Sequence, residues 1–247
     1  MNRALLAEWT KLRTVRSTVA VAAGVAVAMV AGTALIIANT NVPLCTGRSP
    51  DCGTVDTTAL TLSGVHFAQL AAIALAALVV GAEFQPRTIR TTLAMDPRRV
   101  RVFTAKSSVI AGTVLVGGAL GVAGAMGAAT VLFDDKSVTG HPATLPRAAG
   151  AVLYLVLVAL LSAGVATAVR HAGGSMGAVV ALLYGPYLLT TVVPLPAHTL
   201  HLVQDLAPMT AGLGTAPLGP WAGLSILTAY TLTALAIGGA LFVVRDA

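Results

Sequence analysis

Long apolar windows without charged residues recur along the chain, separated by shorter polar segments. Both 17–38 and 148–169 lie between polar or basic residues and hold 22 residues each. A bilayer core about 30 Å thick takes roughly 20 helical residues, so each window predicts one membrane-spanning helix. The six predicted spans are 17–38, 59–82, 106–132, 148–169, 174–194 and 221–244.

The remaining segments fit a single transmembrane domain covering 1–247. In residues 1–16 the apolar side chains fall on one side of a helix, which predicts an interfacial helix lying flat on the membrane before the first span. Residues 83–101 are predicted to form a cytoplasmic loop, and 195–220 a shallow, partly helical outer segment. In the fifth span, Pro186 predicts a kink and Pro194 the end of the helix.

Composition narrows the fold class. Apolar residues make up 56% of the chain and charged residues 10%, against about 25% charged in ordinary soluble proteins. This balance excludes a soluble globular domain and predicts an all-α polytopic integral membrane protein. The basic N-terminus continues to Arg16 without a convincing cleavage site, so we expect the first span to be retained.

The distribution of Lys and Arg predicts the orientation. With a cytoplasmic N-terminus, 12 of the 15 basic residues fall on the inner side, and only Arg48, Lys136 and Arg147 fall outside. With acidic residues counted, the inner segments carry 12 − 4 = +8 and the outer segments 3 − 5 = −2, which sum to the net +6. The positive-inside rule therefore places both termini in the cytoplasm. The net charge follows from topology, so no nucleic-acid partner is needed to explain it.

Two cysteines lie in the first predicted outer loop. Cys45 and Cys52 stand in "NVPLCTGRSPDCGTVD", on the side where a disulfide can persist. A disulfide closing this short loop is worth on the order of 2.5 kcal/mol in the chain-entropy description. Two free thiols, or a metal pair whose other ligands are absent from the loop, are the alternatives to the predicted bond.

Basic residues gather between the second and third spans, in "EFQPRTIRTTLAMDPRRVRVFTAK". Pro86 suits the first turn of a short helix, and Asp96-Pro97 would stop it. Ile89 and Leu93 would share one face of that helix, while arginines would face elsewhere. We expect a membrane-anchored cytoplasmic element that offers a face to a partner; a loop that only anchors the chain at the headgroups is the alternative.

Together with "AEWTKLRTVRST" before the first span, this segment resembles permease subunits of type-2 ABC exporters, and the resemblance covers essentially the whole chain. The chain departs from the family at Gln85 and Pro86. The resemblance implies a coupling helix that docks on a separate ATPase. It assigns the docking role to Glu83, Arg87, Ile89, Arg90, Leu93, Arg98 and Arg99.

The resemblance also implies partners and a location. They are two copies of a cytoplasmic ABC ATPase, a second permease, identical or homologous, and the lipids of a bacterial cytoplasmic membrane. The sequence contains no G-x-x-x-x-G-K-[ST] phosphate loop, so ATP and magnesium would be used by the partner, and no cofactor is expected on this chain. Hydrophobic or amphipathic cargo, as in multidrug efflux and antibiotic resistance, suits such spans. A non-transporting anchor or sensor that recruits an ATPase is the alternative.

Other patterns suggest chemistry less strongly. "GGSMG" at 173–177, preceded by His171, matches the G-x-S-x-G pattern of hydrolases, and an intramembrane protease is a rival class. That pattern needs a strand-to-helix elbow, whereas here it opens a membrane helix, so close helix packing is the favoured interpretation. His198, His201 and Asp205 could share a helical face and bind a metal, although an interfacial half-helix explains the segment better.

Between their end residues, the six spans contain no Lys, Arg, Asp or Glu, which argues against a proton-coupled pump or an ion channel. His66 and Gln69 in the second span are the notable polar side chains. They could contact substrate in a central path, or form hydrogen bonds between helices. Glycines recur in the third span and predict close helix approach within the chain or with a second permease: Gly117, Gly118, Gly121, Gly124 and Gly127.

Overall fold

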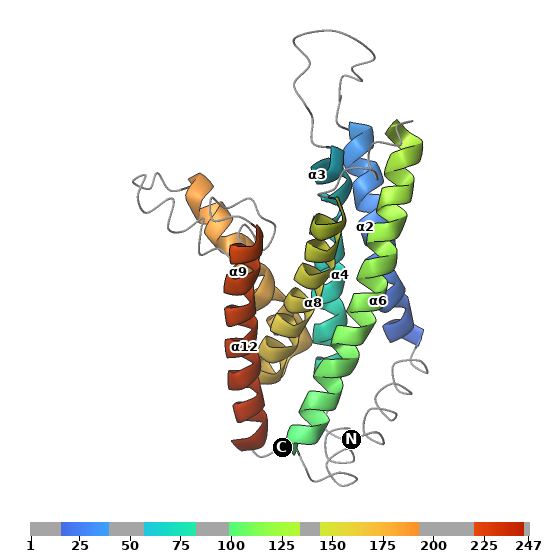
Figure 1. The fold of residues 1–247 in the computed structure, drawn as a ribbon. Coiled ribbons are helices and arrows are strands. Elements are labelled where there is room, and N and C mark those ends of the chain that lie inside the picture. The colour runs from blue at the N-terminus through green and yellow to red at the C-terminus, as the bar shows by residue number, and fades with distance from the viewer. Residues whose placement is uncertain (1–15, 40–56, 83–98, 134–143, 193–219, 245–247) are drawn as a thin grey trace.

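The computed structural model describes residues 16–39, 57–82, 99–133, 144–192 and 220–244. In these ranges the elements are all helices (Figure 1). They are α2 (Arg16–Asn39), α3 (Thr57–Leu62), α4 (Val65–Gly81), α6 (Arg99–Phe133), α8 (Thr144–Val169), α9 (Ala172–Val192) and α12 (Pro220–Val244). The predicted all-α class is therefore confirmed for this part of the chain.

Four helical stretches are long and apolar enough to cross a membrane, and they agree with four of the predicted windows. They are Thr58–Gly81, Val100–Leu132, Thr144–Val169 and Trp221–Val244. Two shorter apolar stretches, Ala23–Asn39 in α2 and Ala172–Pro186 in α9, lie in the remaining two windows. The chain therefore has the character of a helical membrane protein, while the full set of six spans stays a prediction.

The helix of the third predicted span begins earlier in the chain than the charge pattern indicated. We expected it to begin at 106, but α6 begins at Arg99 and runs for 35 residues. At 1.5 Å per residue this helix is about 50 Å long, well beyond the thickness of a hydrocarbon core. Since no proline interrupts 99–133, helical geometry continues past the apolar part and carries Arg101 and Lys106 on the same rigid element.

The second predicted span is divided into α3 and α4. Gly64 lies at the junction, against α2, and a Cβ atom there would stand 2.2 Å from the carbonyl oxygen of Met29. The hydroxyl of Thr33 on α2 also donates a hydrogen bond of 2.8 Å to the carbonyl oxygen of Thr61. The close crossing of α2 thus explains both the glycine and the irregular turn, neither of which hydropathy alone could indicate.

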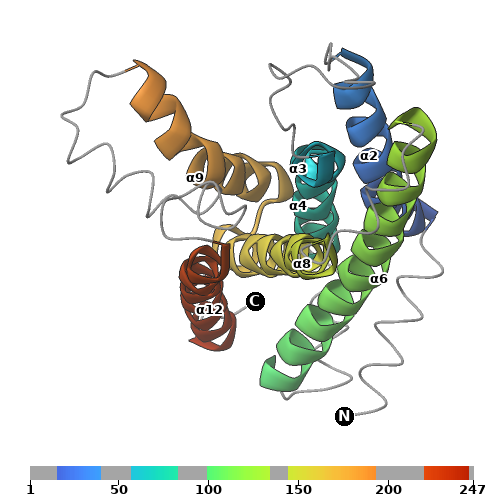
Figure 2. The same ribbon diagram turned by 45° about the horizontal axis from the view of Figure 1, so that its top comes forward.

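The helix α8 lies at the centre of the bundle. It packs against α4, α6, α9 and α12, and Figure 2 shows it nearly end-on between them. Over the apolar windows, 67% of residues in the α8 stretch are buried, compared with 22% in the α12 stretch. Most of the α12 surface therefore faces outward, toward lipid or a partner.

Two of the glycines predicted to allow close approach in the third span, Gly121 and Gly124, do so, whereas a Cβ atom on Gly127 would meet nothing within 4 Å. A Cβ atom on Gly121 would lie 2.9 Å from Cβ of Met29, and one on Gly124 would lie 2.8 Å from Cγ2 of Val30, so both pack against α2. A Cβ atom on Gly164 of α8 would lie 2.6 Å from the carbonyl carbon of Ala234 on α12. These contacts lie within one chain, which was one of the two arrangements expected.

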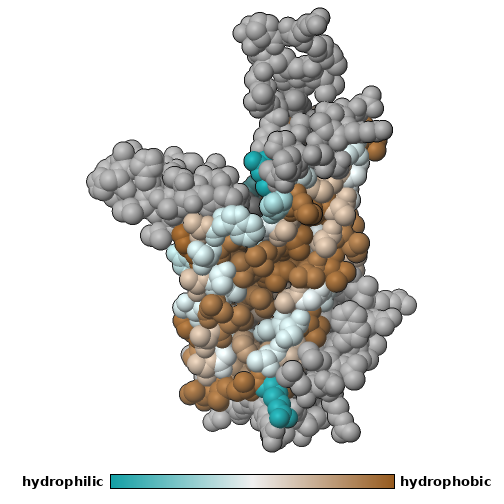
Figure 3. All heavy atoms as spheres, viewed as in Figure 1, coloured by the Kyte–Doolittle hydropathy of each residue, from teal (hydrophilic) through white to brown (hydrophobic). Residues whose placement is uncertain are grey.

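The exterior of the described helices is mainly apolar. In the view of Figure 3, hydrophobic residues cover most of the coloured surface, and the most hydrophilic residues lie near its two ends. Exposed apolar side chains come from several helices, among them Val27, Leu120, Leu153 and Leu232. In water such a surface would be unstable, whereas in a bilayer lipid tails solvate it.

Candidate functional site

A buried polar cluster joins three helices inside the apolar bundle. The hydroxyl of Tyr154 on α8 donates a hydrogen bond of 2.5 Å to Oε1 of Gln69 on α4. The Nε2 atom of Gln69 in turn donates a hydrogen bond to the hydroxyl of Tyr184 on α9. Gln69 and Tyr154 are fully buried. We call Gln69, Tyr154 and Tyr184 the polar cluster.

The hydrogen bonds of the polar cluster satisfy amide and hydroxyl groups whose burial would otherwise be unfavourable. An amide or a hydroxyl without a hydrogen-bond partner in an apolar medium costs several kcal/mol. Gln69 uses its acceptor for one tyrosine and one of its donors for the other, so a single side chain connects α8 with α9. The cluster therefore fixes the relative positions of three helices at a point where apolar packing alone is not directional.

The sequence pointed to Gln69 but missed its partners. Interhelical hydrogen bonding was one of the two roles considered for Gln69, and the structure gives it that contact. Tyr154 and Tyr184 are two of only four tyrosines in the chain. Tyrosines usually lie at the membrane interface, so their position well inside apolar windows was the available signal.

His66 lies on α4, three residues before Gln69, and is half-buried. Its backbone amide donates a hydrogen bond of 3.2 Å to the carbonyl oxygen of Ser63, which is part of the turn between α3 and α4. His66 thus lies in the first turn of α4, directly after that turn. A substrate contact for His66 stays a prediction.

Beyond the polar cluster, α9 separates from the rest of the bundle (Figures 1 and 2). Pro186 follows Tyr184 by two residues and is accommodated inside the helix, which continues to Val192. The two side chains described past this point are exposed, Leu188 by 56% and Val192 by 79%. Tyr184 therefore holds α9 to α4 next to a proline that removes one backbone hydrogen bond and weakens the helix locally.

Basic residues collect at one end of the described bundle. The Nζ atom of Lys106, which is buried, lies 3.4 Å from the carbonyl oxygen of Val79 near the end of α4. A cation is favourable beside the carbonyl groups that end a helix. The start of α6 and the end of α4 are consequently held side by side, and both ends of segment 83–98 are attached there.

Five of the six basic residues in the described ranges belong to this end. Arg16 and Arg99 begin α2 and α6, Arg101 and Lys106 follow in α6, and Arg170 follows the end of α8. Arg147 alone lies at the opposite end, near the start of α8. The helix α2 begins and α12 ends at the end that carries the five residues (Figure 1). We call it the basic end.

The turn at the basic end is compact. Arg170 adopts a left-handed backbone conformation with φ of 60°, and its amide donates a hydrogen bond of 2.9 Å to the carbonyl oxygen of Ala166. This geometry ends α8 as a glycine usually would and reverses the chain into α9. Ala172 then packs against Gly81, where an added Cβ atom would lie 2.7 Å away.

The "GGSMG" stretch does not present a serine–histidine pair in the structure. The Oγ atom of Ser175 donates a hydrogen bond of 2.8 Å to the carbonyl oxygen of Ala172. Nδ1 of His171 accepts one of 3.0 Å from the amide of Gly174. Both side chains thus form hydrogen bonds with backbone groups at the start of α9. A Cβ atom on Gly177 would meet nothing within 4 Å, so the helix packing predicted for this stretch occurs at Ala172 instead.

Most of the predicted docking residues lie outside the described ranges, as do both cysteines and the outer histidines. These residues are Glu83, Arg87, Ile89, Arg90, Leu93, Arg98, Cys45, Cys52, His198, His201 and Asp205. Arg99 is described as the first residue of α6. Within the described ranges, no group of three His, Cys, Asp or Glu side chains is arranged to hold a metal ion. No family model and no curated protein matches the chain.

Proposed function

We propose that the chain is the membrane-spanning permease subunit of an ATP-driven exporter, with six spans and both termini in the cytoplasm. The observation that carries the proposal is the antiparallel pairing of α4 and α6 at the basic end. It is supported by the contact between Lys106 and Val79, which holds together the two attachment points of segment 83–98. That segment carries the "TIRTTL" core and the arginines that resemble a coupling helix.

A contact between the two helix ends suits the transmission of force. If an ATPase moves segment 83–98, the displacement reaches α4 and α6 together, because their ends are in contact. The helix α6 is 35 residues long and packs along α2 and α8, so a movement at the basic end would be carried across the bundle. Packed helices transmit such displacements because their interfaces deform little.

The same proposal gives the polar cluster a role. Gln69 and the half-buried His66 lie on α4, and Tyr184 lies on α9, where that helix begins to separate from the bundle. A substrate path beside these residues would have a few polar contacts in an otherwise apolar wall, which suits hydrophobic or amphipathic cargo. In this proposal, the bonds of the polar cluster are made in one state of the transport cycle and broken in another.

The proposal is tested by co-expression with an ABC ATPase, taken from the genes adjacent to this one where one is found. We expect the two proteins to co-purify from membranes in detergent. The triple variant Ile89→Ala, Arg90→Glu, Leu93→Ala removes the proposed docking face and should abolish co-purification. The matched control is Arg147→Glu at the opposite end of the bundle, which should retain it. Unchanged association of the triple variant would contradict the assignment of the docking segment.

An anchor or sensor that recruits an ATPase without transport shares the docking surface but needs no substrate path. Reconstitution of the co-purified complex into liposomes distinguishes the two. A permease should give ATP hydrolysis that rises with a hydrophobic cargo and accumulation of that cargo on the far side. An anchor should give association alone.

A further inference from the structure

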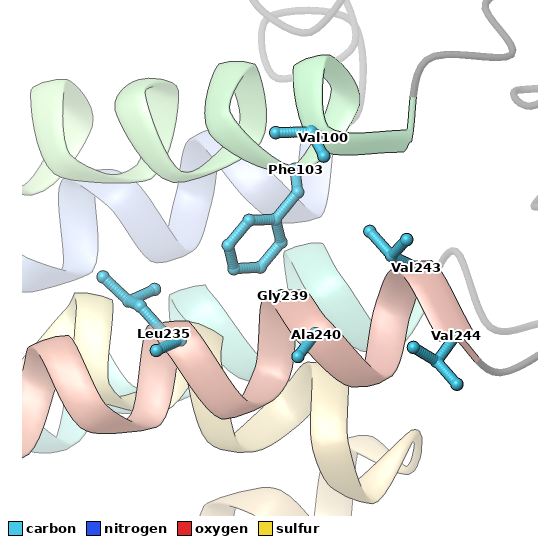
Figure 4. Close-up of a pocket in the computed structure, with 8 residues that line it drawn as sticks. Val100, Phe103, Leu235, Gly239, Ala240, Val243 and Val244 are labelled. Carbon is cyan, nitrogen blue, oxygen red and sulfur yellow. The ribbon is translucent and has the colours of Figure 1, made fainter.

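An apolar groove separates α6 from α12 at the basic end, away from the polar cluster. Its volume is about 390 Å³, and it is lined by Val100, Phe103, Leu235, Gly239, Ala240 and Val243, with the last turn of α12 completing it (Figure 4). Both walls belong to helices that are long and apolar enough to cross a membrane. The groove therefore lies between two candidate spans.

The groove has a defined shape because its inner side is packed. The rings of Phe103 and Phe242 have centroids 6.2 Å apart, which ties α6 to α12 there. The Phe103 ring packs directly against Gly239, since a Cβ atom at that position would lie 3.2 Å from Cε1 of Phe103. Figure 4 shows the Phe103 side chain directed toward α12, between Leu235 and Val243.

The chemistry of the lining selects an acyl chain. All side chains that line the groove are hydrocarbon, so water inside it would find almost no hydrogen-bond partners. Within a bilayer, the molecules that surround the groove are lipids, and their acyl tails can enter it. The outer rim is open to it, because Val100 is exposed by 60% and Val243 by 45%.

An exposed arginine next in sequence to a lining residue favours an anionic headgroup. Arg101 follows Val100 in the first turns of α6 and is exposed. No acidic residue occurs anywhere in the described ranges, so no described carboxylate competes for its guanidinium. Basic pockets between membrane helices on the cytoplasmic side bind anionic headgroups, and a guanidinium is well suited to a phosphate.

We propose that this groove is a binding site for one phospholipid with an anionic headgroup, whose acyl chain lies in the groove against Phe103 and Leu235 and whose headgroup contacts Arg101. The site is separate from the proposed docking segment and from the polar cluster. It would make the relative position of α6 and α12 depend on lipid composition, since the two helices make few other contacts.

Tryptophan quenching by brominated lipids tests this site. Trp9 and Trp221 are replaced by Phe in the full chain, and Phe103→Trp supplies the reporter inside the groove. The matched control is Leu78→Trp, which is exposed on α4 at the same end of the bundle. Each protein is reconstituted in phosphatidylcholine vesicles that contain increasing fractions of brominated phosphatidylglycerol or brominated phosphatidylcholine.

We expect half-maximal quenching of the groove reporter at an about fivefold lower fraction of the anionic lipid, as one arginine near the headgroup would give. Arg101→Gln should abolish this preference, and the Leu78→Trp control should show little. Val243→Trp gives a second reporter if Phe103→Trp does not fold with native helicity.

Three outcomes would overturn the proposal. Equal quenching of the groove reporter by the two lipids would remove the anionic selectivity. Preference that persists in Arg101→Gln would remove the role of that residue. An unquenched groove reporter beside a quenched Leu78→Trp control would mean that protein fills the groove, from this chain or from a second copy.

Discussion

The hydroxyl of Tyr154 lies 2.5 Å from Oε1 of Gln69, which is 85 residues earlier in the chain, and the same Gln69 donates to Tyr184. We predict that Tyr154→Phe lowers the free energy of unfolding by about 1 kcal/mol, the usual size of a hydrogen bond between membrane helices. The measurement is unfolding of the purified protein in mixed micelles, followed by helical circular dichroism.

Substitution of the whole polar cluster gives a sharper result. The triple variant Gln69→Leu, Tyr154→Phe, Tyr184→Phe leaves no unsatisfied partner in the cluster. The decrease in its free energy of unfolding should therefore be smaller than the sum of the decreases in the three single variants. Losses that simply add would contradict the coupling of the three side chains through Gln69.

A second prediction concerns the contact of α8 with α12. We expect Gly164→Ala to destabilise the protein by about 1–3 kcal/mol, because the new methyl group would overlap the backbone of Ala234 and push the helices apart. Gly112→Ala on α6 is the matched control, since nothing lies within 4 Å of its added Cβ atom. Thermal unfolding in detergent compares the two; equal midpoints would show that α8 and α12 tolerate separation.

A third prediction concerns orientation. In a background with both cysteines replaced by serine, Arg147→Cys should react with a membrane-impermeant maleimide on intact cells. Arg98→Cys should react only after the membrane is opened, because the positive-inside rule predicts that the basic end faces the cytoplasm. Labelling of Arg98→Cys on intact cells would contradict the predicted topology, because it would place the proposed docking site outside the cell, where an ATPase cannot bind it.

A fourth prediction concerns Cys45 and Cys52. When the denatured protein is treated with a mass-tagged maleimide, we expect no tag without reductant and two tags after reduction. Loss of the bond by Cys45→Ser should cost on the order of 2.5 kcal/mol in the chain-entropy description. Two tags without reductant would mean that the thiols are free and that this contribution is absent.

Charge-free windows were a reliable guide to the helices, because burial of an unpaired charge in lipid is costly at any position in a span. They placed most helix ends within two residues, but they missed the starts of α6 and α8, which lie seven and four residues earlier than predicted. Arg101 and Lys106 belong to α6 because the helix continues beyond the apolar part, and Lys106 is accommodated by the carbonyl oxygen of Val79. A sequence window cannot indicate that a charged residue will find such a neighbour.

The polar cluster was predictable only in part. Gln69 stands out in an apolar window, but its pairing with Tyr154 and Tyr184 depends on how α4, α8 and α9 are arranged in space. The break at Gly64 likewise depends on the crossing of α2. Composition and spacing describe one helix at a time, whereas these features arise where two or three helices meet.

The central claim is that segment 83–98 couples this membrane domain to an ATPase. The most direct measurement is ATP hydrolysis by the ATPase mixed with each reconstituted chain in liposomes, with and without a hydrophobic cargo. The account predicts hydrolysis that the cargo stimulates in the native chain and that becomes independent of cargo in the variant Ile89→Ala, Arg90→Glu, Leu93→Ala. Equal stimulation in both proteins would contradict it.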